Sequence, residues 1–233
     1  MLQYNDYKVF YNAYDNDIYY MIKAIVSDLD GTLVNTAEVL AKSWEAAFMK
    51  AGIKQTSDEL LKNIKGLSPK DIIKRYKEGP DKELLRKLKQ TRREEVLKYI
   101  KNADQLLYPD TIKFLESVKR MGLKIAVATG MSRDLLKDVL DMSGISGFLD
   151  AVVSSDDVER GKPFPDVFVE AFNMIKIDPK EGIVIGDSIN DVEPGHEIGA
   201  LTVFISRSGE KVDKADWNVS NLMKIVSLIK GTK

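Results

Sequence analysis

Two aspartates, Asp28 and Asp30, lie one residue apart in the segment DLDGTL at residues 28–33. Carboxylates held this close repel each other and lose hydration, unless a cation or a proton compensates them. Gly31 would let the chain turn sharply and bring its backbone close to a ligand. The pair therefore suggests metal or proton chemistry, and a plain aspartate–glycine turn is the competing interpretation.

A second pair of acids, Asp187 and Asp191, occurs in the segment GDSIND at residues 186–191. Asp187 follows a short apolar stretch, and Asp191 comes four residues later, in the first turn of a predicted helix. Two acids facing the first pair would build the oxygen-rich site that Mg²⁺ prefers. Helix capping by Asp187 or Ser188 is the alternative, and both roles can hold at once.

Two further segments could bind an anion. Thr129 and Gly130 close an apolar stretch, where a hydroxyl and exposed amides could bind a phosphoryl oxygen, although a plain capping threonine is the better explanation of this segment taken alone. Lys162 lies in the segment GKPFPD at residues 161–166, where two prolines restrict the loop. A fixed ammonium supports charge on a nucleophile and on a transferring phosphoryl group. A surface lysine in a rigid loop is the alternative.

Each of these segments lies near the end of a short apolar stretch. The stretches are continuously hydrophobic, which predicts strands buried on both faces of a sheet. They span residues 22–27, 124–129, 151–155, 183–187 and 202–206. Helical patterns between them imply right-handed crossovers, so we predict an α/β fold with a doubly wound parallel sheet in a Rossmann-like core. Ligands bind at the carboxyl ends of the strands in such sheets.

The chain between the first two predicted strands contains helical patterns and no convincing strand. Thr56 and Glu59 have the spacing of a capping box, and Ser68 precedes a proline at a helix start. A basic helix spans about residues 81–100, and its charged side chains, Arg92 among them, are expected on a solvated outer face; steering of anionic substrates is the alternative. The predicted division is an all-helical cap at residues 35–107 and a catalytic core at residues 21–34 and 108–233.

Composition excludes several classes of site. Among its 233 residues the chain has no cysteine, which excludes disulfides, thiolate zinc sites and a cysteine nucleophile. The single histidine, His196, excludes a multi-histidine metal cluster. A net charge of -1 gives no general attraction to nucleic acid or to an anionic membrane. No apolar run is long enough to span a membrane and no signal-peptide pattern is present, so we expect a cytoplasmic protein.

Residues 1–20 form a tyrosine-rich N-terminal extension, which holds most of the nine tyrosines of the chain. The extension could be a hairpin added to a sheet edge, an oligomer contact, or a segment unrelated to the chemistry. Met21 immediately precedes a predicted strand, so translation could begin there.

In their order and spacing, the four segments resemble the motifs of the haloacid dehalogenase-like superfamily, most of whose members are phosphatases. The resemblance extends from about residue 21 to the end of the chain. The helical insert resembles the cap of the branch that contains phosphoglycolate phosphatase and β-phosphoglucomutase. Residues 65–68 look like the substrate-specificity loop of that branch, which implies that Gly66 and Ser68 contact the substrate; a glycine turn before a helix start is the alternative. Tyr108-Pro109-Asp110 resembles the family's Tyr-Pro-Gly re-entry into the core, with Asp110 in place of glycine.

The resemblance implies a magnesium-dependent phosphatase that hydrolyses small phosphomonoesters, such as phosphoglycolate or a sugar phosphate, through an aspartyl-phosphate. Asp28 would attack phosphorus, and Asp30 would protonate the leaving oxygen and later activate water. Thr129, Gly130 and Lys162 would bind the phosphoryl group, and Lys162 would also orient the nucleophile.

The same resemblance implies a Mg²⁺ site formed by the Asp28 carboxylate, the Asp30 backbone carbonyl and Asp187, with Asp191 in support. A dehalogenase attacks carbon and needs no acid at Asp30, so the sequence argues against it. A β-phosphoglucomutase-like mutase uses the same aspartates and remains the alternative. A non-catalytic binding protein is disfavoured because every motif residue is present. The expected partner is a small phosphorylated metabolite.

Overall fold

The computed structural model describes residues 7–13, 16–101 and 106–231. Its centre is a sheet of six parallel strands in the order β5-β4-β3-β6-β7-β8. The strands are β3 (Ala24–Ser27), β4 (Lys124–Ala128), β5 (Ala151–Val153), β6 (Gly182–Gly186), β7 (Leu201–Ile205) and β8 (Trp217–Val219). Every residue of β3, β6 and β7 is buried, as strands covered on both faces require. The predicted α/β fold with a doubly wound parallel sheet is confirmed.

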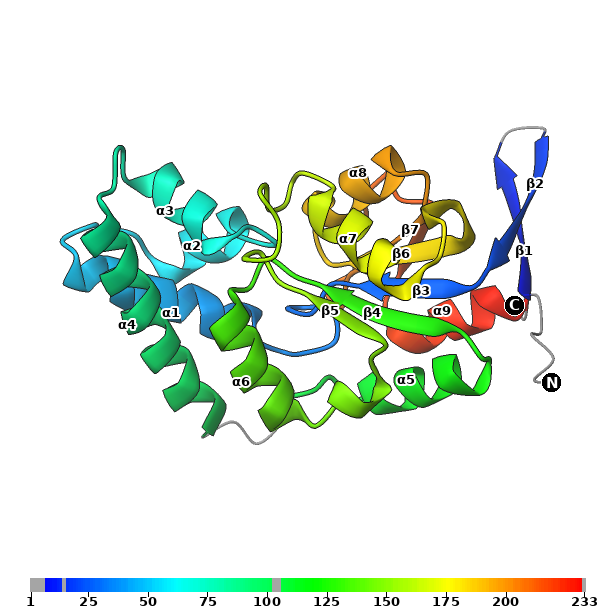
Figure 1. Cartoon of the computed structure of the whole chain (residues 1–233), viewed down its shortest axis with the longest axis horizontal. Helices are drawn as coiled ribbons and strands as arrows, with labels where there is room; N and C mark the ends of the chain where they lie inside the picture. Colours follow the sequence, from blue (N-terminus) through cyan, green and yellow to red (C-terminus); the bar gives the residue numbers. More distant parts are fainter. Residues whose placement is uncertain (1–6, 14–15, 102–105, 232–233) are drawn as a thin grey trace.

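Helices cover both faces of this sheet (Figure 1). Ile25 belongs to the hydrophobic core beneath α5, α6 and α9, whereas its neighbour Val26 belongs to the core beneath α7. On that second face α8 packs so closely that a Cβ atom at Gly195 would lie 3.1 Å from Cβ of Val184. The helices are α5 (Thr111–Arg120), α6 (Arg133–Ser143), α7 (Asp166–Ile175), α8 (Ile189–Glu197) and α9 (Leu222–Ile229), with short 3₁₀ turns at η1 (Ser146–Phe148) and η2 (Pro179–Glu181).

The sequence pattern misplaces strand boundaries by one or two residues and misses one strand of the sheet. Ile22, assigned above to the first strand of the sheet, is the last residue of β2 in a separate hairpin. β8 at the sheet edge has three residues, of which one is buried, so it shows no apolar run that could reveal it.

The N-terminal hairpin pairs β1 (Tyr7–Ala13) with β2 (Asn16–Ile22) in an antiparallel two-stranded sheet. It does not join the edge of the six-stranded sheet, so the interpretation as an added edge hairpin is corrected in that respect. Residues 1–6 and 14–15 of the extension lie outside the described residues. Met21 pairs with Lys8, so a chain beginning at Met21 would lack nearly the whole hairpin.

Four helices, α1 (Ala37–Lys50), α2 (Ser57–Asn63), α3 (Pro69–Tyr76) and α4 (Lys82–Lys101), follow the first strand of the sheet. We call them the cap helices. They share a hydrophobic core of their own and lie at the end of the sheet to which the strands' carboxyl ends point (Figure 1). The capping box of Thr56 and Glu59 forms, and Ser68 caps α3, so both predicted helix starts are confirmed.

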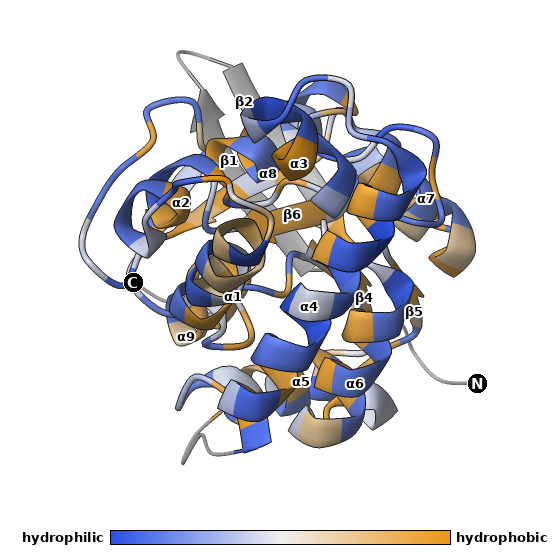
Figure 2. Cartoon of the chain, turned by 90° about the vertical axis from the view of Figure 1, so that its left-hand side faces the viewer, coloured by the Kyte–Doolittle hydropathy of each residue, from blue (hydrophilic) through white to orange (hydrophobic). Residues whose placement is uncertain are grey.

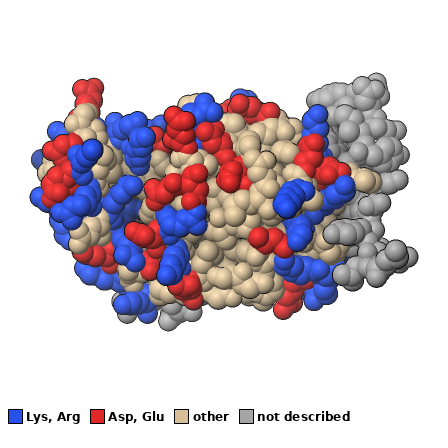
Figure 3. Space-filling view, viewed as in Figure 1, with Lys and Arg blue, Asp and Glu red and all other residues tan. Residues whose placement is uncertain are grey.

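The surface of the cap helices is charged without a single sign. Figure 2 looks onto these helices and shows hydrophilic residues along much of α4. Figure 3 shows basic and acidic side chains intermixed at this end of the molecule, and Arg86 of α4 pairs with Glu83 of the same helix at 2.9 Å. None of the described helices has both the length and the apolar character that a membrane span requires.

Candidate active site

Three carboxylates meet where β3 and β6 end. Asp28 follows β3 directly, is 2% exposed, and its backbone N–H donates to the carbonyl of Ile185 at 2.7 Å. Asp187 follows β6, and Asp191 lies in the first turn of α8. Oxygen atoms of Asp28, Asp187 and Asp191 lie within 4.8 Å of one another. The structure thus brings together acids that are about 160 residues apart in sequence, because parallel strands end at the same edge of a sheet.

Two glycines make this close approach possible. A Cβ atom at Gly31 would lie 2.3 Å from Oδ2 of Asp187, and a Cβ atom at Gly186 would lie 2.2 Å from Cγ of Asp191. Gly31 also has a φ of +77°, a conformation that side-chain-bearing residues rarely adopt. No other residue type fits at either position without moving a carboxylate.

We expect Gly31→Ala to displace Asp187 and to lower the phosphate-ester turnover that the family resemblance implies by at least about 100-fold. The matched control is Gly122→Ala, because Gly122 has a similar φ of +72° but has no atom within 4 Å of the added methyl group. Both variants should lose roughly 1 kcal/mol of unfolding free energy from the unfavourable φ. Turnover and thermal unfolding of the two variants provide the measurement. Equal activity in both would show that the contact with Asp187 does not matter.

Lys162 is a fully buried cation between two of the acids. Its Nζ lies 2.6 Å from Oδ1 of Asp28 and 2.6 Å from Oδ1 of Asp191, and its side chain has no exposed surface. Burial alone would lower the pKa of Lys162, but the charges of Asp191 and Asp28 outweigh burial and raise it. The ammonium therefore stays charged, and the alternative of a surface lysine in a rigid loop is wrong.

The acidic cluster holds more negative charge than Lys162 compensates. Burial, together with the charge of Asp28, raises the pKa of Asp187 to about 6. Burial also raises the pKa of Asp191, although the Lys162 ammonium opposes this effect. A cation bound to these oxygens would relieve the repulsion, so the donor set fits a hard divalent metal ion.

The Asp30 carboxyl group makes its own contacts with two threonines. Thr36, a fully buried residue, donates a hydrogen bond to Oδ1 of Asp30, and Thr129 donates a longer one of 3.4 Å to Oδ2. Burial and then the charge of Asp28 raise the pKa of Asp30 to about 7, so the group exchanges its proton near neutral pH. Thr36 occupies the N-cap position of α1 without making a capping hydrogen bond, and its hydroxyl donates to Asp30.

The loop between α2 and α3 contacts the loop after β4. A Cβ atom at Gly130 would lie 2.4 Å from the carbonyl oxygen of Gly66, so the two backbones pack directly. Gly66 and Gly130 both line the pocket that contains Asp28 and Asp30. Ser68 does not line it: its hydroxyl binds Asp71 and caps α3. Ser68 is therefore not part of the lining of this pocket, and its contact with a substrate stays a prediction.

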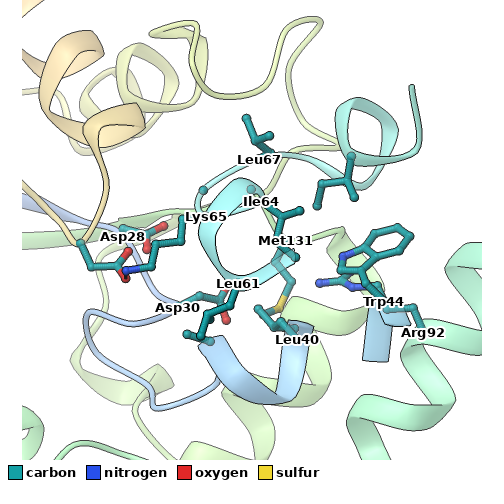
Figure 4. Close-up of a pocket in the computed structure, with 15 residues that line it drawn as sticks. Asp28, Asp30, Leu40, Trp44, Leu61, Ile64, Lys65, Leu67, Arg92 and Met131 are labelled. Atoms are coloured by element: carbon teal, nitrogen blue, oxygen red, sulfur yellow. Dashed lines mark ion pairs between the residues drawn. The ribbon is translucent and has the colours of Figure 1, made fainter. Parts of the chain in front are cut away.

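The pocket lies between the acids and the cap helices (Figure 4). Asp28 and Asp30 line one end of the pocket. Trp44 of α1 and Arg92 of α4 line the other end. Lys65 extends from the cap loop to Asp187, with its Nζ 3.3 Å from Oδ2. The remaining wall is mostly apolar and includes Leu40, Leu61, Ile64, Leu67 and Met131.

The model of the haloacid dehalogenase-like hydrolase family matches residues 25–205 of the chain. The chain belongs to this family. The match covers the whole acidic cluster and most of the sheet, and it confirms the resemblance drawn from the four motifs. The family places the protein among hydrolases, so the prediction of an enzyme is confirmed as well.

Several curated relatives have names that describe enzymes acting on small phosphorylated compounds. The chain is 26% identical over 214 residues to a putative pyrophosphatase of Clostridium perfringens, a match covering 90% of this chain and 98% of the relative. It is 28% identical over 190 residues to a phosphoglycolate phosphatase of Aquifex aeolicus, covering 78% and 84%. It is 29% identical over 227 residues to a glyceraldehyde 3-phosphate phosphatase of Methanocaldococcus jannaschii, covering 91% and 99%.

Solved structures of other proteins also have a fold similar to that of this chain. A hydrolase from Pseudomonas syringae aligns with a TM-score of 0.79 at 22% identity, over 90% of this chain and 98% of that one. A β-phosphoglucomutase from Clostridium difficile aligns with a TM-score of 0.79 at 21% identity, over 91% and 98%. At this identity the two alignments establish the shared fold.

Arg92 corrects the sequence analysis of α4. The side chain is 5% exposed and faces the pocket, whereas the basic composition of the helix led to an outer, solvated position for it. A signal for burial was present, because Leu88 and Val96 lie one helical turn to either side of Arg92 and both are buried. Thr36 had no such signal, since a threonine before a helix is explained by capping alone.

Proposed function

We propose that the protein is a Mg²⁺-dependent phosphatase that hydrolyses small phosphate esters or anhydrides through an aspartyl-phosphate on Asp28. The observation that carries the proposal is the fully buried ammonium of Lys162, which bridges Asp28 and Asp191 beside Asp187. This arrangement fixes a carboxylate nucleophile in a site that is built for additional positive charge. The names of the curated relatives support phosphoryl groups as the substrates.

Mg²⁺ would be held by the carboxylates of Asp28 and Asp187 and by the backbone carbonyl of Asp30, with Asp191 close by. When bound, it supplies positive charge that stabilises the transferring phosphoryl group and relieves repulsion within the acidic cluster. The all-oxygen donor set and the raised pKa of Asp187 support this assignment.

Asp28 acts as the nucleophile. Its position at the end of β3, the hydrogen bond from Lys162 and its near-complete burial hold the carboxylate in one orientation. Such positioning supplies much of the rate enhancement in phosphoryl transfer, where the transition state demands alignment and charge neutralisation. Lys162 would also face the charge that develops on the phosphoryl oxygens, and Thr129 and Gly130, which follow β4, would bind the same group.

Asp30 acts as the general acid and then as the general base. A pKa of about 7 lets the group donate a proton to the leaving oxygen and, once deprotonated, accept one from the attacking water. Thr36 holds the carboxyl group toward the pocket. Asp30 therefore lies on the leaving-group side of the site, between Asp28 and the cap helices.

The substrates that we propose are short: phosphoglycolate, pyrophosphate or glyceraldehyde 3-phosphate, the compounds in the names of the relatives. A hexose phosphate would place several hydroxyl groups against Leu40, Leu61 and Met131, whose side chains offer no hydrogen-bond donor and at most the weak acceptor of the Met131 thioether. This lining disfavours the mutase alternative. We keep the division of the chain into an all-helical cap at residues 35–107 and a catalytic core at residues 21–34 and 108–233 as part of this proposal.

Phosphate release and product analysis test the proposal. The metal-free protein should release no inorganic phosphate from these substrates, and Mg²⁺ should restore the activity and raise the unfolding temperature. The expected product is inorganic phosphate with the free alcohol, acid or phosphate. An isomerised sugar phosphate without phosphate release would establish a mutase, and full activity in the presence of a strong chelator would refute the metal requirement.

A further inference from the structure

Two buried N–H donors on the cap helices have no acceptor among the described residues. Nε of Arg92 on α4 and Nε1 of Trp44 on α1 are both buried, and neither has a hydrogen-bond partner. The guanidinium of Arg92 stacks on the indole of Trp44 at 4.9 Å from the ring centroid. Both residues line the pocket that contains Asp28 and Asp30.

Unpartnered donors of this kind destabilise a folded protein, because burial removes water and nothing replaces it. The effect is larger for a charged group. Burial lowers the pKa of Arg92 to about 10, with the charge of Asp30 opposing it, so the guanidinium remains charged at neutral pH. A buried cation whose Nε–H has no acceptor among the described residues, and which lines a pocket, points to a ligand that supplies the acceptor.

The position of Arg92 shows which part of a ligand it would meet. Asp30, the proposed proton donor to the leaving oxygen, and Arg92 line the same pocket and interact electrostatically. In Figure 4 the nitrogen end of Arg92 extends past Trp44 toward the interior of the pocket, near Met131. A leaving group whose oxygen contacts Asp30 therefore extends toward Arg92 and Trp44.

We propose that Arg92 and Trp44 bind an anionic group on the leaving group, and that the substrate is a short phosphate ester or anhydride with a second negative charge. The anion is a carboxylate or a phosphate, because either one accepts hydrogen bonds from a guanidinium fork. This assignment rests on the proposed phosphatase function. Of the three substrates above, it favours phosphoglycolate and pyrophosphate over glyceraldehyde 3-phosphate, whose aldehyde end would leave the cation unpaired.

Replacement of Arg92 by methionine separates this role from a structural one. Met keeps much of the apolar bulk that packs on Trp44 and removes a buried charge. If Arg92 serves the substrate, Arg92→Met should unfold at the same temperature as the parent protein or at a higher one. If Arg92 instead stabilises the cap helices, the same change should lower the unfolding temperature.

The experiment measures kcat/KM of the full-length protein with Mg²⁺ for phosphoglycolate, inorganic pyrophosphate and ethyl phosphate, whose leaving group is uncharged. We expect the parent protein to prefer a substrate with an anionic leaving group, which we call an anionic substrate, over ethyl phosphate. Arg92→Met should lower kcat/KM for the preferred anionic substrate by roughly 10- to 100-fold and change that for ethyl phosphate by less than about 3-fold. Trp44→Phe should reduce the same preference less. The substrate whose kcat/KM falls most in Arg92→Met identifies the bound anion as a carboxylate or a phosphate.

Arg86→Met is the matched control, because Arg86 lies on the same helix but is exposed and pairs with Glu83. It should leave all three rates unchanged. The proposal is overturned if the parent protein shows no preference for an anionic substrate, or if Arg92→Met lowers all three rates alike. A parent protein that hydrolyses none of the three compounds refutes the phosphatase function itself, which is a different result from lost discrimination.

Discussion

Asp28→Asn is expected to lower turnover of every phosphate substrate by at least about 10⁴-fold, because an amide cannot form the aspartyl-phosphate. The fold should survive. Lys162 keeps Asp191 as its second partner at 2.6 Å, and the change removes one of the charges that raise the pKa of Asp187. The measurement is steady-state phosphate release together with thermal unfolding of the purified variant.

The control for this prediction is Asp141→Asn, which makes the same chemical change at an exposed residue of α6. It should retain the activity of the parent protein. If Asp28→Asn kept near-full activity while folded, Asp28 could not be the nucleophile, and the role of the whole acidic cluster would need another explanation.

Asp30→Asn is expected to lower turnover by roughly 10²- to 10⁴-fold for substrates with poor leaving groups, the usual contribution of general acid–base catalysis. Burial and Asp28 raise the pKa of Asp30 to about 7, so the protonated form that donates to the leaving oxygen is lost as the pH rises through that value. A bound cation weakens the repulsion from Asp28 and so lowers this midpoint. The alkaline decline of kcat should therefore have its midpoint at or below pH 7.

The decisive comparison for Asp30 is between leaving groups and across pH. With a leaving group that needs no proton, such as p-nitrophenolate, the formation of the aspartyl-phosphate should be far less affected than with an alkyl phosphate. The alkaline decline seen with the alkyl phosphate should disappear in Asp30→Asn. An unchanged pH profile in that variant would assign the proton transfer to another group.

The sequence predicts the core of the site because its residues are tied to elements with strong local signals. Asp28 and Asp187 each follow an apolar run, and a parallel sheet brings the ends of such runs together. The family resemblance then supplies the expected role of each of the four motifs. The short edge strand β8 escaped the prediction because it lacks an apolar run. A hairpin was one interpretation of the N-terminal extension, but the local pattern does not indicate whether such a hairpin joins the edge of the main sheet.

The contacts that depend on tertiary packing were harder to predict. The basic composition of α4 suggested that Arg92 is exposed, whereas its spacing from apolar residues on the same helix suggested that it is buried. The structure shows that Arg92 is buried, as the spacing indicates. Asp110, noted in the sequence as a departure from the family's glycine, accepts the backbone N–H of Leu222 at 2.7 Å and pairs with Arg207 at 3.0 Å. It thereby joins the starts of α5 and α9, a role that only the folded chain reveals.

The central claim is a covalent phosphoryl group on Asp28, and mass spectrometry of the acid-quenched enzyme tests it most directly. Asp30→Asn should be mixed with Mg²⁺ and p-nitrophenyl phosphate, since this variant can form the intermediate but hydrolyses it slowly. We predict that the peptide containing Asp28 gains the mass of one phosphoryl group, and that Asp28→Asn gains none. Rapid release of p-nitrophenol by Asp30→Asn without any phosphorylated peptide, or with the group on a different residue, would contradict the account.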